Sequence, residues 1–239
     1  MTYKAIFYDM LGINKWLFIW INQLTNISFI DKFLYIVAHS FDTKSLAVIY
    51  LIYCVYLCIA INYKVKTFNF KNTKIKYLKI EEYFLPRYLV VIKITLCYGI
   101  FIILFTILKI SSNMPRPFCS LNNFEFITIE QLKMSSCFHS FPSAHTGSVI
   151  LISYYLWQYS NKTVKYLFIT IILIVSISRI SLAMHYPSDI IYSVLITYII
   201  ILINNYSVNQ SNYFITLIGK KIFKMLFSIF NKTNSKIKV

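Results

Sequence analysis

The strongest constraint on the fold of this chain is a series of long apolar runs separated by short polar segments. The runs cover about 45–62, 88–108, 146–159, 166–178 and 190–204, and a sixth, less uniform one lies within 12–38. Because a helix rises 1.5 Å per residue, about 20 apolar residues cross the ~30 Å hydrocarbon layer of a bilayer. The three later runs reach that length only with the polar residues at their ends in the interface. We therefore predict an all-α, polytopic membrane bundle of about six transmembrane helices.

The composition fits a bilayer environment and a single domain over residues 1–239. Hydrophobic residues make up 58% of the chain, charged residues 13%, and the mean hydropathy is +0.63. A water-soluble fold would lack the polar side chains to cover its surface. With four glycines and five prolines in the chain, no linker or low-complexity tract sets off a second domain.

The net charge of +16 indicates membrane topology rather than nucleic-acid binding, because the basic residues are concentrated in particular segments. Of 24 lysines and arginines, seven lie in 63–87, two in 160–165 and six after residue 205. Alternating spans place these segments on one side, which is cytoplasmic by the positive-inside rule. We expect 63–87 to be a basic cytoplasmic loop and 205–239 a basic cytoplasmic tail on the membrane surface, with both termini cytoplasmic.

The sequence of the first 40 residues does not show whether they form a transmembrane helix. Asp31 and Lys32 interrupt the apolar residues within 12–38, and NKWLFIWINQL fits an amphipathic helix that lies in the interface. The sequence leaves both readings open, a transmembrane helix or a partly interfacial one within 1–40.

The opposite, outer side contains the residues that are able to take part in catalysis or ligand binding. Alternation places 38–44, 109–145 and 179–189 together there, with 118–140 as a long outer loop. These segments contain all four histidines, His39, His139, His145 and His185, and also Lys109, Arg116, Arg179 and Asp189. Chance would scatter such residues over both sides, so we expect a functional site on the outer face.

The first motif is KISSNMPRP, from Lys109 to Pro117. A lysine at a helix end commonly extends to the interface, so Lys109 alone has a structural explanation. Arg116 lies between two prolines, which hold it on a stiff extended segment. Such a segment suits a guanidinium that binds phosphate oxygens in a fixed direction.

The second motif is FPSAHTG, which opens the fourth apolar run. Pro142 fits the first turn of a helix, and Ser143 with the following amides would present free donors to an anion. His145 would then project beside the bound group. A capped helix start with an interfacial histidine is the structural alternative.

The third motif is RISLAMHYPSD, from Arg179 to Asp189. Pro187 predicts the start of another helix, and the dipole of that helix would stabilise Asp189. Asp189 lies within reach of His185, and a paired carboxylate fixes the tautomer of an imidazole and raises its basicity. Arg179, at the end of the preceding run, is either an interfacial residue or part of the site.

Together the three motifs indicate phosphoryl transfer. Cations and helix amides would hold the phosphate oxygens, one histidine would attack phosphorus, and the other would protonate the leaving oxygen. The chemistry requires no metal or cofactor, and the outer face lacks the carboxylate cluster of a magnesium site and the Cys/His spacing of a zinc site.

The motifs resemble those of the type 2 phosphatidic acid phosphatase family. The matching residues are Lys109, Arg116 and Pro117, then Pro142-Ser143-Ala144-His145, and then Ser178, Arg179, His185 and Asp189. The resemblance implies that His185 is a nucleophile forming a phosphohistidine, that Asp189 orients it, and that His145 is the acid and then the base. It also implies phosphate binding by Lys109, Arg116, Arg179 and the Ser143-Ala144 segment.

Two alanines depart from the family pattern. Ala144 and Ala183 stand where the family commonly has glycine. An alanine is accommodated without strain where φ is negative, so we expect an altered pocket size rather than lost activity. Vanadium haloperoxidases resemble the same motifs, but they are soluble, and this composition argues against them.

The resemblance to small bacterial members of the family implies a bacterial inner-membrane protein with its active site facing the periplasm. The substrate would be a membrane lipid with a phosphorylated head group. We favour lipid A 1-phosphate, with undecaprenyl diphosphate and phosphatidylglycerophosphate as alternatives. A nonenzymatic lipid transporter on the same scaffold is the alternative of a different class. His139 and Lys133 either contact the head group or are solvated loop residues.

Two of the five cysteines, Cys119 and Cys137, lie in the long outer loop. An oxidising periplasm would allow them to pair, so a disulfide between them is possible in that compartment. Cys54, Cys58 and Cys97 lie within apolar runs, where cysteine behaves as a small buried hydrophobic residue.

Overall fold

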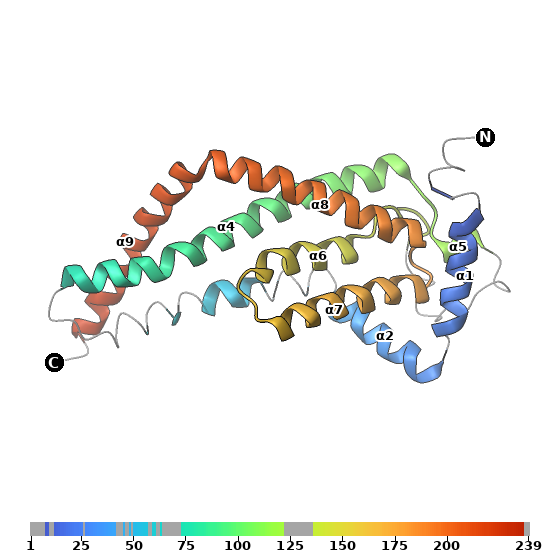
Figure 1. Cartoon of the computed structure of the whole chain (residues 1–239), viewed down its shortest axis with the longest axis horizontal. Coiled ribbons are helices and arrows are strands. Elements are labelled where there is room, and N and C mark those ends of the chain that lie inside the picture. Colours follow the sequence, from blue (N-terminus) through green and yellow to red (C-terminus); the bar gives the residue numbers. More distant parts are fainter. Residues whose placement is uncertain are drawn as a thin grey trace. The chain divides into compact units, whose positions relative to one another are not determined.

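Every regular element in the part of the chain that the structure describes is a helix (Figure 1). The structure is a computed structural model, and it describes residues 8–9, 12–25, 27–41, 45, 48, 50–56, 59–60, 63, 73–121 and 136–236. The helices are α1 (Ile13–Thr25), α2 (Ser28–Ser40), α4 (Thr73–Ser112), α5 (Pro117–Ser120), α6 (Ala144–Trp157), α7 (Lys162–Ser181), α8 (Pro187–Gln210) and α9 (Asn212–Lys236). The predicted all-α class is confirmed for these residues.

Three helical segments within the described ranges are long and apolar enough to cross a membrane. They are Ile75–Ser120, which contains most of α4, and the helices α7 and α8. α6 has 14 residues and rises only about 21 Å, so it needs its polar ends in the interface to cross a ~30 Å layer. Much of the run at 45–62 lies outside the described residues, so six spans stays a prediction.

The chain divides into two compact units. Unit 1 comprises Met1–Leu46 and Tyr98–Ile201, and unit 2 comprises Ala47–Cys97 and Leu202–Val239. The long helices α4 and α8 each contribute one part to unit 1 and the other part to unit 2. All the residues that the three motifs nominate for the site belong to unit 1.

Unit 1 is built around α7, against which α1, α2 and α6 pack. Its apolar core contains Phe18 of α1, Ile180 of α7 and Ile190 of α8, together with Ala183 and Tyr186 from the connection between α7 and α8. Two residues of the connection that carries the third motif are therefore part of the core, and their packing fixes the position of this connection.

The helices α7 and α8 begin where the sequence provides local start signals. The side chain of Asn161 caps α7 by accepting a hydrogen bond from the Val164 amide at 2.9 Å. α8 begins at Pro187, with Asp189 in its first turn, so the predicted proline-first start is confirmed. An aspartate at this place is stabilised by the positive end of the helix dipole.

The segment 12–38 is not one continuous helix, because α1 ends at Thr25 and α2 begins at Ser28. Each has 13 residues and rises about 20 Å, which is too short to span alone. α1 is amphipathic, but its polar residues Asn14 and Asn22 are buried, whereas Trp16 and Trp20 are 63% and 52% exposed. An outward face in contact with lipid favours apolar side chains, so the polar ones turn inward to protein partners.

Unit 2 pairs the first part of α4 with α9. Ile80 and Phe84 of α4 pack against Phe223 of α9, and all three are buried. The expected loop at 63–87 is therefore helical from Thr73 onwards, and the expected tail at 205–239 is helical as far as Lys236. Apolar residues that recur at helical spacing among the lysines of both segments form the two faces that pack together, which is why these segments fold.

Candidate active site

Three connecting segments meet at one end of unit 1. They are 113–116 with α5 after α4, 136–143 before α6, and 182–186 between α7 and α8. Backbone hydrogen bonds join these segments, from Arg116 N to Cys137 O (2.8 Å), from Ser140 N to Met114 O (3.0 Å) and from Phe118 N to Ala183 O (3.3 Å). Motifs that lie far apart in the sequence are thus brought to one place.

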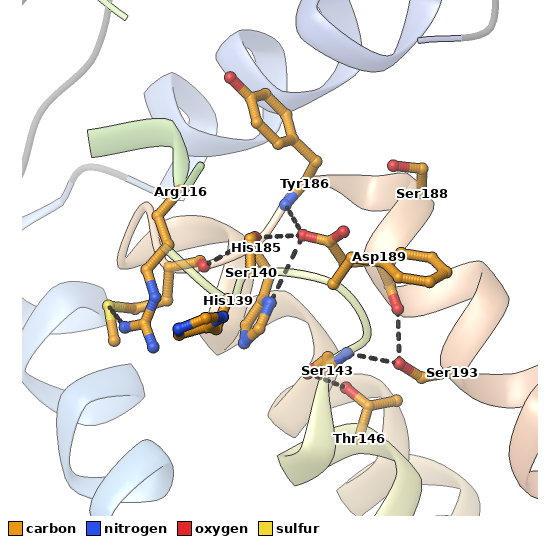
Figure 2. Close-up of polar contacts among 12 residues, drawn as sticks. Arg116, His139, Ser140, Ser143, Thr146, His185, Tyr186, Ser188, Asp189 and Ser193 are labelled. Carbon is orange, nitrogen blue, oxygen red and sulfur yellow. Dashed lines mark hydrogen bonds and ion pairs between the residues drawn. The ribbon is translucent and has the colours of Figure 1, made fainter. Parts of the chain in front are cut away.

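His185 and Asp189 face each other across the start of α8 (Figure 2). His185 Nδ1 lies 3.4 Å from Asp189 Oδ2, and both side chains are buried. This separation is longer than a strong hydrogen bond, and catalytic contacts of this kind commonly tighten when substrate binds. Because Nδ1 is turned to the carboxylate, Nε2 is the ring nitrogen left to meet a substrate.

The Asp189 carboxylate is held by further donors (Figure 2). Oδ2 accepts hydrogen bonds from Ser140 Oγ at 2.5 Å and from the Tyr186 amide at 2.9 Å. Oδ1 accepts from the hydroxyl of Tyr8 at 2.8 Å. A buried carboxylate with donors on both oxygens is fixed in one orientation and stays ready to accept from His185.

His185 is neutral in this environment. Burial lowers its pKa well below the usual 6.5, and the positive charges of Lys109, Arg179 and Arg116 lower it further. A neutral imidazole keeps a lone pair on the nitrogen that carries no proton. His185 therefore has the protonation state that a nucleophile requires.

Lys109 and His139 form a reciprocal pair near the end of α4. Lys109 Nζ donates to the His139 carbonyl at 2.8 Å, and His139 Nδ1 lies 2.9 Å from the Lys109 carbonyl. His139 is thus half-buried and bound to the backbone, rather than a freely solvated loop residue. Lys133, the other residue expected either to contact the head group or to be solvated, lies outside the described residues.

The two arginines reach the site from different elements. Arg116 is extended, with φ −78° and ψ 153°, which matches the conformation expected between two prolines. Its guanidinium lies 3.4 Å from Met184 Sδ. Arg179 is buried near the end of α7, and its carbonyl accepts the amides of Met184 and His185 at 3.1 and 3.2 Å. The backbone of Arg179 therefore holds the loop that carries His185.

The second motif forms the start of α6, which begins at Ala144 with Ser143 as the N-cap. The expectation that Pro142 lies in the first turn is wrong, because Ser143 is still extended and the helix starts after it. The Ser143 amide is also not a free donor, since it donates to Ser193 Oγ of α8 at 2.7 Å. His145 lies in the first turn, within electrostatic range of His185 and of the three cations Lys109, Arg116 and Arg179.

The two alanines behave differently. Ala144 is the first residue of α6 and has helical geometry, so alanine costs nothing there. Ala183 has a φ of +51° and is fully buried, so the condition of a negative φ does not hold at this position. The left-handed region is unfavourable for residues with a Cβ. The loop before His185 therefore contains a strained alanine at a position where glycine would be relaxed.

A disulfide joins Cys119 of α5 to Cys137, with the Cα atoms 5.6 Å apart. It ties the segment of the first motif to the segment that leads into the second. Arg116 N donates to the carbonyl of the same Cys137, so the cross-link lies next to the backbone of a site arginine.

Several supporting residues of the site were not identified from the sequence. Ser193 had a detectable signal, because it follows Asp189 by four residues on one helix face. Ser140 lies beside the second motif without a pattern of its own. Tyr8 and Asn14 belong to a segment that nothing in the sequence connects to the motifs. Within the described ranges, no cluster of three or more His, Cys, Asp or Glu side chains is arranged to hold a metal ion.

Comparison with known proteins agrees with this geometry. A family model described as the PAP2 superfamily matches residues 90–213. The crystal structure of Aquifex aeolicus LpxE has a similar fold, with a TM-score of 0.58 and 19% sequence identity over 81% of this chain and 95% of that chain. A comparison with curated protein sequences finds no significant match.

The apolar helices, the clustered site and these similarities define a membrane lipid phosphatase. The chain belongs to the PAP2 superfamily, because the family model matches more than half of it. The resemblance inferred from the three motifs is therefore confirmed, and the protein is a phosphoric ester hydrolase.

Proposed function

We propose that the protein hydrolyses a phosphate monoester or diphosphate on a lipid head group through a phosphohistidine at His185, without a metal ion. The observation that carries this proposal is the buried His185 imidazole, whose Nδ1 lies 3.4 Å from Asp189 Oδ2, with three cations within electrostatic range. Fixed cations around a neutral nucleophile suit a substrate that brings its own negative charge.

In the first step, His185 Nε2 attacks phosphorus, a P–N bond forms, and the bond from phosphorus to the lipid oxygen breaks. Nδ1 keeps its proton and uses it to donate a hydrogen bond to Asp189 Oδ2 as the imidazole becomes positive. His145 gives a proton to the leaving oxygen, so the lipid departs as a neutral alcohol. Lys109, Arg116, Arg179 and the start of α6 at Ser143-Ala144 hold the phosphate oxygens.

In the second step, His145 accepts a proton from water, and the oxygen of that water attacks the phosphohistidine. The P–N bond breaks, inorganic phosphate is released, His185 returns to the neutral state, and His145 returns to the protonated state in which it began the cycle. One histidine thus alternates between acid and base while the other carries the phosphoryl group.

We place the protein in a bacterial inner membrane with this site on the periplasmic side. The disulfide between Cys119 and Cys137 supports an oxidising compartment for the end of unit 1 that holds the motifs. The hydrogen bond from Tyr8 to Asp189 puts the N-terminal segment at the same end. An outer site is therefore incompatible with the expected cytoplasmic position of this segment, and we replace that expectation with a periplasmic one.

Lipid A 1-phosphate remains the substrate that we favour, and undecaprenyl diphosphate and phosphatidylglycerophosphate remain alternatives. A direct comparison of phosphate release from these three lipids by the purified protein distinguishes them. Release from all three at equal rates would contradict a dedicated lipid A enzyme.

The catalytic proposal is tested with His185→Ala and with His39→Ala as a matched control. His39 is an exposed histidine near the end of α2 that contacts Tyr35. We expect His185→Ala to abolish phosphate release and His39→Ala to retain it. Equal rates for wild type and His185→Ala would overturn the enzymatic role of His185 and favour a nonenzymatic lipid-binding protein.

The intermediate is tested with ³²P-labelled p-nitrophenyl phosphate, whose leaving group departs without an acid. In His145→Ala the first step should then proceed while the second is slow, so labelled protein should accumulate. We expect the label to survive base and to be lost in acid, as a phosphohistidine does, and to be absent from the His145→Ala/His185→Ala double variant. Label that persists in the double variant would place the phosphoryl group elsewhere.

A further inference from the structure

The N-terminal segment forms hydrogen bonds with the active-site loop, which lies more than 150 residues away in the sequence. Asn14 of α1 exchanges two hydrogen bonds with Ser188: Asn14 Nδ2 donates to Ser188 Oγ at 2.8 Å, and Ser188 N donates to Asn14 Oδ1 at 3.0 Å. Asn22 Nδ2 donates to the Ser181 carbonyl at 2.6 Å. These contacts lie on either side of His185, so α1 fixes both ends of the loop that carries it.

Tyr8 adds a further hydrogen bond, from its hydroxyl to Asp189. The carbonyl of its neighbour Asp9 accepts hydrogen bonds from the amides of Gly12 and Asn14, at 2.9 and 3.2 Å, which ties residues 8–9 to the start of α1. The ring of Tyr8 packs edge-to-face against Phe141 and Tyr186, with centroids 5.9 and 6.3 Å apart. The hydroxyl thus has a defined position, from which it donates to Asp189 Oδ1.

The direction of this hydrogen bond is fixed. Burial and the neighbouring Asp189 carboxylate raise the pKa of the Tyr8 hydroxyl, so it remains protonated. A phenol beside a carboxylate can only donate to it. The contact therefore acts on Asp189 wherever its carboxylate is ionised.

We propose that Tyr8 is a positioning residue of the phosphatase, whose hydroxyl holds the Asp189 carboxylate so that Oδ2 faces His185 Nδ1. This inference rests on the proposed function. Without the hydroxyl, Oδ1 loses a buried donor, and the carboxylate gains freedom to rotate away from the imidazole. Fewer molecules then present Nε2 of His185 in the attacking orientation. Because Tyr8 acts on the nucleophile and does not hold the substrate, the effect falls on kcat.

The test is Tyr8→Phe, which removes the hydroxyl and keeps the ring that packs against Phe141 and Tyr186. We expect kcat to fall about 10- to 100-fold with KM unchanged, as for the loss of one hydrogen bond to a charged group. The matched control is Tyr50→Phe, because Tyr50 donates its hydroxyl to the Val91 carbonyl rather than to a carboxylate. The control should retain the wild-type kcat.

A merely structural role is distinguished by repeating the substitution in an Asp189→Ala background. Tyr8 then has no carboxylate to position, so Tyr8→Phe should change the residual rate less than about twofold. If Tyr8 only stabilises the fold, the substitution costs the same factor in both backgrounds, and the inference is overturned.

The pH profile gives a second, independent readout. In the molecules that keep Oδ2 facing His185, removing a donor from Oδ1 leaves more negative charge on the carboxylate, which raises the pKa of the imidazole. The acid limb of kcat should therefore move to higher pH in Tyr8→Phe. Replacing Tyr8 with 3-fluorotyrosine, a stronger donor of similar shape, should move it to lower pH. An acid limb that stays in place in both variants would refute the inference even where one variant folds poorly.

These outcomes separate the two proposals. A His185→Ala variant that is as active as wild type refutes the proposed function. An inactive His185→Ala variant combined with a fully active Tyr8→Phe variant refutes only the role of Tyr8.

Discussion

Gly147, two residues after His145, offers a sharp test of how the site is supported. A Cβ added at this glycine would lie 2.6 Å from Phe101 Cε2, 2.8 Å from Thr197 Oγ1 and 2.9 Å from Phe105 Cζ. The rings of Phe101 and Phe105 cannot move aside, because they are almost fully buried and pack against each other with centroids 4.0 Å apart. The Gly147→Ala variant must therefore shift α6.

The size of the shift follows from these distances. Ordinary contact begins at 3.4 Å, so α6 has to move by about 0.8 Å relative to Phe101. Overpacking of this kind costs about 1–3 kcal/mol, and each kcal/mol lowers Tm by about 2–4 °C in a protein of this size. His145 lies on the first turn of the same helix, and a misplacement near 1 Å at a catalytic group costs about 100-fold in rate.

Thermal unfolding in detergent and kcat for phosphate release measure both effects. The matched control is Gly99→Ala on α4, where an added Cβ has no neighbour within 4 Å. Alanine in a helix interior is favoured over glycine by about 0.5–1 kcal/mol, so the control should be at least as stable as wild type and equally active. A Gly147→Ala variant that matches this control in both Tm and kcat would refute the close packing of α6.

Three further predictions concern other parts of unit 1. The folded-state pKa of His185 lies well below 6.5, so only the unfolded chain takes up this proton as the pH falls through 6.5, and the folded state loses stability. Between about pH 7.5 and 5, the Tm of His185→Ala should therefore fall less than the Tm of wild type. The Cys119→Ser/Cys137→Ser variant should lose about 3 kcal/mol of stability, because the disulfide closes a loop of 18 residues, and its KM should rise because Arg116 is held beside Cys137. Asp9 is exposed and adjoins Tyr8, so in a chain whose Cys54, Cys58 and Cys97 are replaced by serine, Asp9→Cys should react with a membrane-impermeant maleimide in intact spheroplasts. A reaction that occurs only after lysis would contradict an outer site.

The sequence was most informative where chemistry and local structure coincide. Pro187 followed by Asp189 predicted both a helix start and a carboxylate near His185, and α8 begins at that proline. Continuous apolar runs also identified the long helices α4, α7 and α8, because lipid requires apolar side chains on every face that it contacts.

Long-range partners were not predictable in this way. The hydrogen bond from Tyr8 to Asp189 joins residues 181 positions apart, and neither the segment around Tyr8 nor the third motif has a pattern that identifies the other. The inward polar face of α1 was a detectable sign, since Asn14, Phe18 and Asn22 follow one another at intervals of four residues. Which protein groups that face would meet depends on the packing of unit 1 and not on the helix alone.

The contact between Tyr8 and Asp189 also bears on the number of membrane crossings. If the site is periplasmic, Tyr8 is periplasmic too, and a cytoplasmic tail after α8 requires an odd number of crossings between them. The segment 12–38 is broken into α1 and α2, and without a crossing there the five apolar runs at 45–62, 88–108, 146–159, 166–178 and 190–204 are left. Five crossings satisfy both conditions, whereas six would place Tyr8 and its hydrogen-bond acceptor on opposite sides of the bilayer. We therefore expect five crossings, with α1 held at the active-site end by its polar face and in contact with lipid through Trp16 and Trp20.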